Sequence, residues 1–330
     1  MLKDSILNLA KRIIGKKNIA LRQIISREYK SGHYIRAVGL MIYLFPVKSK
    51  LSEERVYHKY AFVTSSEYYH DIWELLHISK TRGYELIRLG RDNDGGYIML
   101  NDFGNDDKIA YSFGISSDVS WDKDMASRDY EVFMYDHTIE GLPESNSHFH
   151  WFKLGIFDGS TNDDRLKTLE YLIEQNHHQG KQDMILKMDV EGAEWGFLES
   201  VKTETLNRFS QILFEFHGIN KPNLCRRITS ALRKLNQTHK LIHLHGMNAG
   251  YYISNGGKVF CNQIEVLYVR RDKYSFIEDY DVELPINIDM PASKWSEDVV
   301  LGHWNDEFKA DNNNFSMMSA DDNHVSIITV

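Results

Sequence analysis

Two short stretches of the sequence place acidic and imidazole groups directly after apolar runs. Asp189 and Glu191 follow one such run, and Glu215 and His217 end another. An apolar run that stops in groups of this kind predicts a buried strand that reaches the carboxyl edge of a parallel sheet, where ligands bind in open α/β sheets. Because alternate residues of a strand share a face, each pair is expected to point to one side. The spacing therefore predicts three carboxylates and a histidine around one crevice.

A histidine or carboxylate in such a crevice could act as a general base. A positioned base that removes the proton from a hydroxyl group typically accelerates its reaction by about 10²–10⁴-fold. His217 is the first candidate, Glu191 is the second, and His245 of a later segment is the third. Each of them taken singly is equally well explained as a polar group whose hydrogen bonds are satisfied at the end of a strand.

A divalent cation is the competing explanation for the same acids. Asp189, Glu191 and Glu215, with a histidine, could hold Mg²⁺ or Mn²⁺, which prefer oxygen ligands, and a bound metal would acidify a nearby hydroxyl group. The next two polar positions look less reactive. Glu194 is expected to be exposed in the first turn of a helix, where the helix dipole favours an acid, and Trp195 is expected to pack in the core.

The elements that must position these groups begin at about residue 85. Short strands are expected over 85–88 and 97–100, on either side of a turn at 91–96. Strands and helices then alternate, with strands over 109–113, 131–135, 149–154, 184–188, 211–216, 241–244 and 263–269 and helices over 165–174, 193–200 and 221–235. This alternation predicts an α/β fold with a doubly wound, Rossmann-like parallel sheet that has an antiparallel strand late in its order.

The first strand of that sheet, 109–113, runs into the turn 114–118. Gly114 in this turn could let a ligand approach the backbone. Asp136 lies 22 positions later, at the end of the next strand, and an acid at about this spacing holds ribose hydroxyls in dinucleotide sites. The turn contains neither a full GxGxxG nor the GKS/T of a P-loop, so binding of nucleotide phosphates is poorly supported.

The segment Lys187–Glu194, which reads KMDVEGAE, resembles the FkbM-type branch of S-adenosylmethionine-dependent methyltransferases. The segments 94–97 (DGGY), 214–217 (FEFH) and 243–248 (HLHGMN) fit the same branch, and the resemblance covers about residues 84–270. Two positions depart from the family's usual pattern. The first turn keeps only one glycine, and Met247 stands where the family often has an asparagine.

The resemblance implies a class I, Rossmann-like enzyme that uses S-adenosyl-L-methionine, and many members of the family O-methylate sugars. It implies cofactor contacts from Gly114, Ser116 and Asp118, ribose contacts from Asp136, and a place for Asp189 near the methionine end of the cofactor or the acceptor. Methyl transfer is an in-line displacement, so alignment of the acceptor oxygen with the methyl group supplies much of the rate.

The composition is that of an ordinary globular protein, with 42% hydrophobic and 26% charged residues among 330. The charge is uneven. Residues 1–50 contain 11 Lys or Arg against two acids, a balance of +9, whereas the whole chain has a net charge of -8. The pattern predicts a basic helical region over 1–80 and a polar, acidic extension over 286–330, and the resemblance implies a methyltransferase domain between them, over 81–285. The basic region either packs on the acidic body or makes a peripheral contact with an anionic membrane.

Other features indicate where the protein works. No apolar run reaches the roughly 20 residues that a membrane-spanning helix needs, and the two cysteines, Cys225 and Cys261, show no CxxC spacing. A reduced, cytoplasmic compartment is therefore favoured. The acidic body has no basic stripe with interleaved aromatic residues, so nucleic acid is not an expected partner.

Together these patterns predict an S-adenosylmethionine-dependent O-methyltransferase that acts on a sugar hydroxyl of a glycan or glycoconjugate. Two alternatives stay open. One is a metal-dependent glycosyltransferase in which Asp189 and Glu191 form an acidic metal motif. The other is a catalytically silent binding module with the same fold.

Overall fold

The computed structural model describes residues 66–159, 163–249, 251–278, 280–309 and 316–319. By its internal contacts the chain divides into two units, Met1–Phe62 and Val63–Val330, and all the described residues belong to the second unit. The predicted basic region therefore lies largely outside the described residues.

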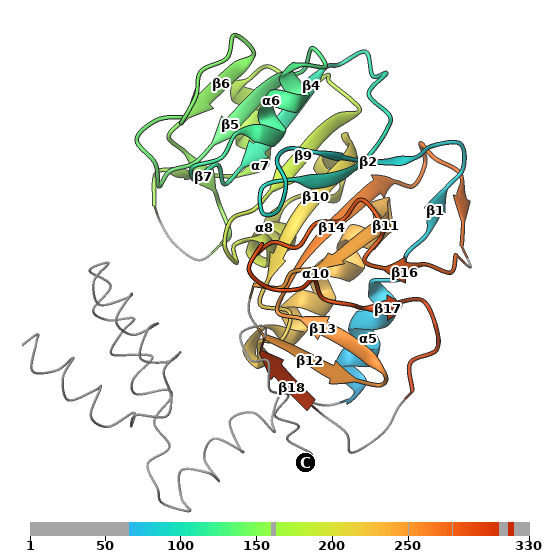
Figure 1. Cartoon of the computed structure of the whole chain (residues 1–330). Helices are drawn as coiled ribbons and strands as arrows, with labels where there is room; N and C mark the ends of the chain where they lie inside the picture. The colour runs from blue at the N-terminus through green and yellow to red at the C-terminus, as the bar shows by residue number, and fades with distance from the viewer. Residues whose placement is uncertain (1–65, 160–162, 250, 279, 310–315, 320–330) are drawn as a thin grey trace, which may run out of the picture. The chain divides into compact units, whose positions relative to one another are not determined.

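A mixed sheet of seven strands organises this unit (Figure 1). Six strands run parallel and β14 runs antiparallel to its two neighbours. The spatial order is β11 (His239–Gly246), β14 (Gln263–Arg270), β10 (Phe209–His217), β9 (Met184–Met188), β4 (Ile109–Phe113), β5 (Glu131–Tyr135) and β6 (Phe149–Phe152). From β4 the chain builds outward to β5 and β6, and it then crosses back to β9 and β10. The strand order therefore reverses between β4 and β9, and such a reversal opens a crevice at the carboxyl ends of the strands.

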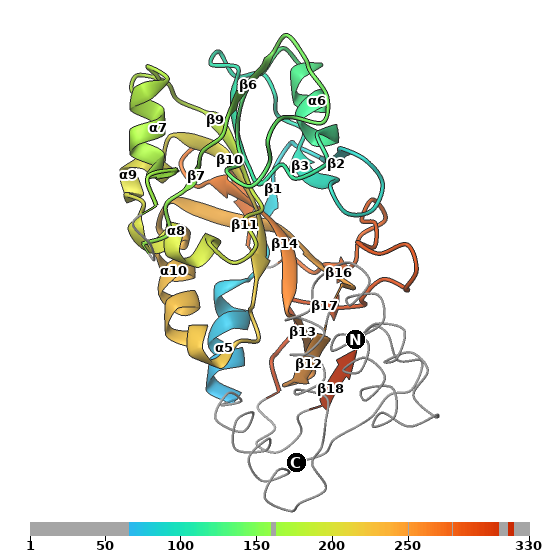
Figure 2. The same cartoon turned by 90° about the vertical axis from the view of Figure 1, so that its left-hand side faces the viewer.

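Helices and a hairpin cover the two faces of the sheet (Figure 2). One face carries α5 (Ser66–Leu75), α7 (Leu169–Gln175), α8 (Glu194–Ser200), α9 (Thr203–Leu206) and α10 (Cys225–Thr238). The other carries α6 (Ser120–Ala126) and the hairpin of β2 (Leu86–Leu89) and β3 (Tyr97–Leu100). α10 shows why such helices form, because its buried residues, Ile228, Ala231, Leu232 and Leu235, recur at the helical spacing that makes one apolar stripe.

Each strand sends alternate side chains into two separate apolar clusters. On β10, Ile212, Phe214 and Phe216 belong to the cluster under the helices, whereas Leu213 belongs to the cluster under the hairpin. Because side chains alternate along a strand, Glu215 and His217 continue the row of Leu213 and lie on the hairpin face. The apolar cluster under the hairpin therefore gives way to acidic and imidazole groups at the carboxyl end of the strand.

The region after residue 280 folds back onto the unit. Leu284, Leu301, Trp304 and Phe308 are buried in the core. Trp304 donates a 2.9 Å hydrogen bond through Nε1 to the carbonyl oxygen of Leu76 at the end of α5, and two short strands, β16 (Glu283–Leu284) and β17 (Gly302–His303), pair antiparallel. In the described part of the predicted extension, 286–309, the chain is thus part of the same core as α5 and the sheet.

The remaining elements are short. They are β1 (Lys80–Thr81) paired with β15 (Phe276–Ile277), β7 (Gly155–Ile156) paired with β8 (Leu166–Lys167), the 3₁₀ helix η1 (Pro222–Leu224), and a sheet of β12 (Tyr251–Asn255), β13 (Lys258–Cys261) and β18 (Ser316–Ser319). Within the described residues, no helix is both long and apolar enough to cross a membrane.

Most predicted elements are confirmed to within a few residues. The predicted helix at 165–174 begins later, at Leu169, because Leu166 and Lys167 form β8 and Thr168 caps the helix by accepting a hydrogen bond from the Tyr171 N–H. α6 and α9 were not predicted, and α9, with four residues, is too short to show a helical period.

Candidate active site

A cleft of about 690 Å³ opens at the reversal point of the sheet, which is within the usual range of about 300–1,000 Å³ for ligand sites. One wall is the turn 114–118 after β4 together with Trp121 and Asp122 of α6. The floor contains residues from β9, β10 and the following segments. Residues 91–95, which contact the turn through Arg91 and Asp118, and residues 292–295 complete the lining. The other lining residues are Tyr97, Lys187, Asp189, Glu191, Glu215, Met247, Ala249 and Gln263.

The register of the strands places acidic side chains in one row across the floor. Met188 pairs with Phe214, so Asp189 lies beside Glu215, and Glu215 pairs in turn with Glu265 of β14. Glu265 pairs with His245 of β11. Residues paired in this way point to the same face. The predicted meeting of acids and histidines at one sheet edge is thus present, and Glu265 extends it.

Tyr97 of β3 covers this row from the hairpin side. Its hydroxyl donates a 3.2 Å hydrogen bond to Oδ2 of Asp189, and the Lys187 ammonium lies 4.8 Å from the centre of its ring. Burial raises the pKa of Tyr97 well above its usual value, and the nearby Asp189, Glu215 and Glu265 raise it further. Tyr97 is therefore a permanent hydrogen-bond donor to the acidic row.

Burial also makes the acids of the row reluctant to ionise. It raises the pKa of Asp189 to about 6, against the opposing pull of Lys187 and His217. It raises the pKa of Glu215 to about 8, and the Asp189 charge adds to this effect. Groups whose pKa values are shifted toward neutrality by burial and by like charges are typical of catalytic acids and bases.

His217 is held between three glutamates. Its Nδ1 lies 3.1 Å from Oε1 of Glu194, and its Nε2 lies 3.2 Å from Oε1 of Glu215 and 3.4 Å from Oε2 of Glu191. Although burial alone would lower the pKa of His217, hydrogen bonds to Glu194 and Glu215 outweigh it and raise the pKa to about 11. The side chain is an imidazolium at neutral pH, and it does not line the cleft. These observations favour a charge-balancing role over that of a general base.

Glu194 differs from its sequence-based interpretation, because it is fully buried instead of exposed. Its Oε1 accepts 3.1 Å hydrogen bonds from the N–H groups of Val190 and Gly192, and it also pairs with His217. The carboxylate therefore closes the loop that follows β9. Trp195 packs in the core as predicted, 1% exposed, and its Nε1 donates to the carbonyl oxygen of His217.

The same loop explains where Glu191 lies. The sequence predicts that Asp189 and Glu191 share a face of a strand. This prediction is wrong, because β9 ends at Met188 and the alternation of strand side chains does not reach Glu191. Glu191 instead has a φ of 56°, in the left-handed region that non-glycine residues rarely adopt. Its side chain is 86% exposed and still lines the cleft. Strained backbone of this kind is often found at ligand sites.

Gly114 is required by the packing of two turns. Its φ is 77°, and a Cβ at this position would lie 1.5 Å from the carbonyl oxygen of Asp189. The glycine therefore lets the turn after β4 touch the turn after β9, which is a different close approach from the ligand contact that the sequence suggests. Gly114, Ser116 and Asp118 all line the cleft, as expected of cofactor-binding residues, and their contacts with a cofactor stay a prediction.

The carboxylate of Asp136 binds the backbone of the turn 114–118. Its Oδ2 accepts hydrogen bonds from the N–H groups of Ile115 at 3.0 Å and Ser116 at 2.9 Å. Its Oδ1 accepts from the N–H and the hydroxyl of Thr138. These bonds lower the pKa of Asp136, although burial opposes them. Asp136 is not among the lining residues, so in this structure it shapes the turn, and the predicted ribose contact stays a prediction.

His245 is enclosed away from the cleft. Its Nδ1 lies 3.3 Å from Oε2 of Glu265, and its Nε2 lies 3.0 Å from Oδ2 of Asp298. Both ring nitrogens are thus paired, and the side chain is 1% exposed. His245 therefore links β11 to the segment around Asp298. Neither nitrogen of its ring is free to take a proton from an acceptor hydroxyl.

Two groups of side chains have ligand atoms close enough to hold a metal ion among the described residues. In the first, Asp189, Glu215 and His217 bring one atom each within 4.8 Å of one another. The predicted set was Asp189, Glu191 and Glu215 with a histidine, and this group lacks Glu191. Because His217 is charged beside its glutamate partners, it would have to lose a proton before it could bind a metal. Metal binding at this edge of the sheet stays a prediction.

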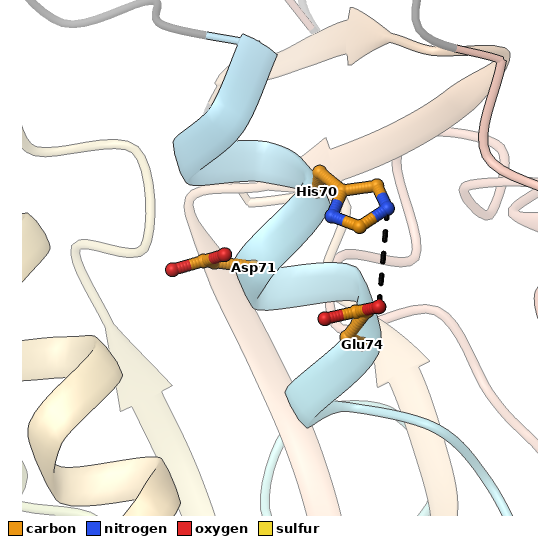
Figure 3. A group of neighbouring side chains, drawn as sticks. All are labelled: His70, Asp71 and Glu74. Carbon is orange, nitrogen blue, oxygen red and sulfur yellow. Dashed lines mark ion pairs between the residues drawn. The ribbon is translucent and has the colours of Figure 1, made fainter.

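The second group, His70, Asp71 and Glu74, lies on α5 (Figure 3). His70 pairs with Glu74 at 3.9 Å, and the carboxylate of Asp71 binds Arg233 at 3.0 Å. The first is an i,i+4 pair within one helix and the second joins α5 to α10, both between exposed side chains, and they give no reason to place a metal there.

Several lining residues were missed by sequence reasoning. Lys187 had a visible signal, because it interrupts the apolar run of β9 and a lysine inside a buried strand is rare. Tyr97 follows the expected turn and gave only a weak signal. Trp121 and Asp122 lie on the short helix α6, and Trp295 lies in irregular chain, so no period marks them.

Comparison with protein families gives one match within this site. Residues 104–240 match the model of the methyltransferase FkbM domain. The match includes β4, β9 and β10 and therefore the turn 114–118, Asp189 and Glu215. No curated protein matches the chain. The seven-stranded mixed sheet is that of a Rossmann-like methyltransferase fold, as predicted, and the match to the FkbM methyltransferase domain covers residues 104–240, somewhat less than half of the chain.

Proposed function

We propose that the protein is an S-adenosylmethionine-dependent O-methyltransferase that acts on a sugar hydroxyl of a glycan or glycoconjugate. The observation that carries this proposal is the row of buried carboxylates at the base of the cleft. Asp189 and Glu215 lie there beside each other, with raised pKa values, directly below the turn that follows the first strand of the sheet.

The residues of the cleft suit the methyl donor that the family implies. Seven acidic residues line the cleft against three basic ones, which favours a ligand with a sulfonium and an ammonium group. Three buried polar atoms of the lining have no hydrogen-bond partner among the described residues, namely Trp121 Nε1, Asp122 Oδ1 and Glu215 Oε2. Buried polar atoms are rarely left unpaired, so these three are suited to a bound molecule.

The proposed division of roles follows from position. The turn 114–118 and Asp122 would hold the cofactor on one side of the cleft, and Lys187 would hold its carboxylate. When bound, the cofactor supplies an electrophilic methyl group. The protein's part is to align an acceptor oxygen with that group, which can contribute much of the rate, and to take up the hydroxyl proton.

For the proton, we assign the base to the Asp189–Glu215 pair. Glu215 lines the cleft, its Oε2 has no hydrogen-bond partner among the described residues, and its Oε1 pairs with His217. Asp189 is oriented by the hydroxyl of Tyr97. Since the two carboxylates are coupled through their charges, the proton belongs to the pair and not to one oxygen. His217 keeps the cluster from accumulating negative charge.

A sugar hydroxyl fits this chemistry better than an acidic acceptor does. A hydroxyl group is a poor nucleophile until a base removes its proton, and the structure provides carboxylates for that step. The acidic lining also disfavours an anionic acceptor. Polar side chains on all sides of the cleft offer the several hydrogen bonds that a polyhydroxylated ring requires.

The proposal is tested by offering the purified protein methyl-labelled cofactor and a panel of neutral glycosides. Transfer of label to a glycoside, and its loss in Glu215→Gln, is the expected result. Binding of S-adenosylhomocysteine without transfer to any acceptor would favour a silent binding module. Turnover of a sugar nucleotide that requires Mn²⁺, with no use of the methyl donor, would favour a glycosyltransferase instead.

A further inference from the structure

Trp295 is an aromatic side chain held in an unusual place. It lines the mouth of the cleft and is 86% exposed, whereas the other tryptophans of the described residues are buried or half-buried. Its ring is therefore accessible to a ligand that enters the cleft. Trp295 lies outside the residues that match the family domain, so the family match assigns it no role.

The segment that carries Trp295 is pinned to the edge of the sheet at both ends. At one end, Nε2 of His243 lies 3.0 Å from Oδ1 of Asp289. At the other, Nε2 of His245 lies 3.0 Å from Oδ2 of Asp298. Both histidines belong to β11, and all these side chains except Asp298 are nearly inaccessible. Two buried pairs therefore fix residues 289–298, which we call the front segment.

Hydrogen bonds also hold the middle of the front segment. Oδ1 of Asn248 accepts from the N–H of Ser293 at 2.7 Å, and its Nδ2 donates to the carbonyl oxygen of Ser293 at 2.9 Å. Asn93 donates to the carbonyl oxygen of Pro291 at 2.9 Å. Trp295 therefore projects from a backbone that is fixed on both sides, which reduces the entropy lost when a ligand binds to it.

The surroundings of Trp295 indicate what kind of ligand it would take. The Lys294 ammonium lies 4.9 Å from the centre of its ring, and most of the ring surface stays open. The nearby lining is polar, with Ser293 and the acidic turn 92–94. One apolar platform bordered by hydrogen-bonding groups matches a molecule with one apolar face and polar edges. A pyranose ring has this character, because its C–H bonds form a face and its hydroxyl groups form the rim.

We propose that Trp295 is the platform of an acceptor subsite, on which the apolar face of a neutral sugar ring stacks. The inference rests on the proposed function and names the part of the site that selects the acceptor. The front segment would hold the sugar, and the acidic row on the floor would receive the hydroxyl that is methylated. The excess of carboxylates in the cleft argues for a neutral ring over a uronic acid.

The chain offers a matched control for this role. Tyr171 on α7 is also an exposed aromatic residue, at 41%, with the Lys167 ammonium 5.3 Å from its ring centre. It does not line the cleft. A general effect of removing an exposed aromatic residue with a lysine over it would appear in Tyr171→Ala as well, whereas loss of the subsite would appear only at Trp295.

The experiment uses methyl glycosides of glucose, mannose and rhamnose, with methyl glucuronide and a nucleoside as contrasting probes. Binding is followed by saturation-transfer NMR on wild type, Trp295→Ala, Trp295→Phe and Tyr171→Ala, and affinity for S-adenosylhomocysteine is measured by calorimetry. Where transfer occurs, the acceptor KM should rise about tenfold or more in Trp295→Ala and stay within about threefold in Trp295→Phe, as expected for loss and retention of aromatic stacking.

The NMR signal of a neutral glycoside should be present in wild type and Tyr171→Ala and absent in Trp295→Ala, with binding of S-adenosylhomocysteine the same in all. An unchanged glycoside signal and KM in Trp295→Ala would overturn the subsite, as would a preference for the glucuronide or the nucleoside. Failure of the proposed function has a separate signature, because wild type would then either not bind S-adenosylhomocysteine or transfer no methyl group to any acceptor. The glycoside signal would still decide whether Trp295 binds sugar.

Discussion

The two sides of the cleft are built in different ways. The floor and the rear wall, from 114–118, 187–191 and Glu215, come from the ends of neighbouring strands, so the register of the sheet fixes their positions. The front segment is irregular chain, and side-chain pairs with His243 and His245 fix it instead. The rear side lies within the matched family domain and the front segment lies outside it. We infer that the sheet supplies the chemistry and the front segment selects the acceptor.

Removing the proposed base should have the largest effect and should separate the two sides. Glu215→Gln keeps the size of the side chain and removes its charge. We expect kcat to fall by about 10²–10⁴-fold, the usual range for loss of a general base, while the acceptor KM stays close to that of wild type. Steady-state kinetics with labelled cofactor measure both.

Glu144→Gln is the matched control for this change. Glu144 is exposed and pairs with Lys123 on the surface, so its substitution should leave kcat unchanged. A Glu215→Gln variant with full kcat would show that the carboxylate row does not take up the proton.

Removing one of the buried ion pairs that hold the front segment should lower the free energy of unfolding. His245→Ala leaves Glu265 and Asp298 without their partner, and loss of one member of a buried pair costs about 3–5 kcal/mol. Urea unfolding measures this change, and hydrogen exchange should show earlier opening of 289–298 than of β9 and β10.

The paired substitution is His303→Ala, which removes an exposed histidine from its exposed partner Asp281. Such surface pairs contribute about 0–1 kcal/mol. Equal losses of stability in the two variants would contradict the view that buried pairs fix the front segment.

The same pair predicts how stability depends on pH. Hydrogen bonds to Asp298 and Glu265 raise the pKa of His245 to about 10, although burial opposes them. A raised pKa in the folded state stabilises the fold fully below the unfolded value of about 6.5, and that contribution is lost as the pH rises through about 10. The difference in unfolding free energy between wild type and His245→Ala should therefore shrink as the pH rises from about 6.5 to about 10 and stay nearly constant above that.

On the rear side, Gly114→Ala should damage the contact between the two turns. The new Cβ would meet the carbonyl oxygen of Asp189 at a φ of 77°, and overpacking of this kind costs about 1–3 kcal/mol. Gly180→Ala is the control, since nothing lies within 4 Å of a Cβ there, and it should change stability by no more than about 0.5 kcal/mol. Thermal unfolding compares the two, and equal melting temperatures would contradict the packing role.

The smallest expected effect is a change of activity with pH. The raised pKa values of Asp189, to about 6, and Glu215, to about 8, mean that the pair gains charge as the pH rises through this window. Because the deprotonated pair is the base, kcat should rise from pH 6 to pH 8 and then level off. A profile that is flat over this range, or one that falls, would speak against the pair.

The difference between the two sides also explains what the sequence could predict. The strands were predicted because their apolar runs are local, and the positions of Asp189 and Glu215 followed from where those runs end. The roles of His217 and Glu194 did not follow. A charged histidine and a buried first-turn glutamate arise from contacts between β10 and the loop after β9, 23 residues apart, which no local pattern shows.

The front segment could not be predicted for the same physical reason. Its residues have no helical or strand period, and the polar composition beyond residue 285 suggested a polar, acidic extension over 286–330. Only the pairing of His243 and His245 with Asp289 and Asp298, some 46 and 53 residues away, turns that stretch into a wall of the cleft. Trp295 gains its meaning from this placement alone.

The most direct test of the account is a crystal structure of the full chain with S-adenosylhomocysteine. We expect the ligand in the cleft between the turn 114–118 and Lys187 and Asp189, with its sulfur facing the carboxylate row and the front segment across an open space for the acceptor. A ligand bound elsewhere, without contact to Asp189 or to the turn after β4, would contradict the account.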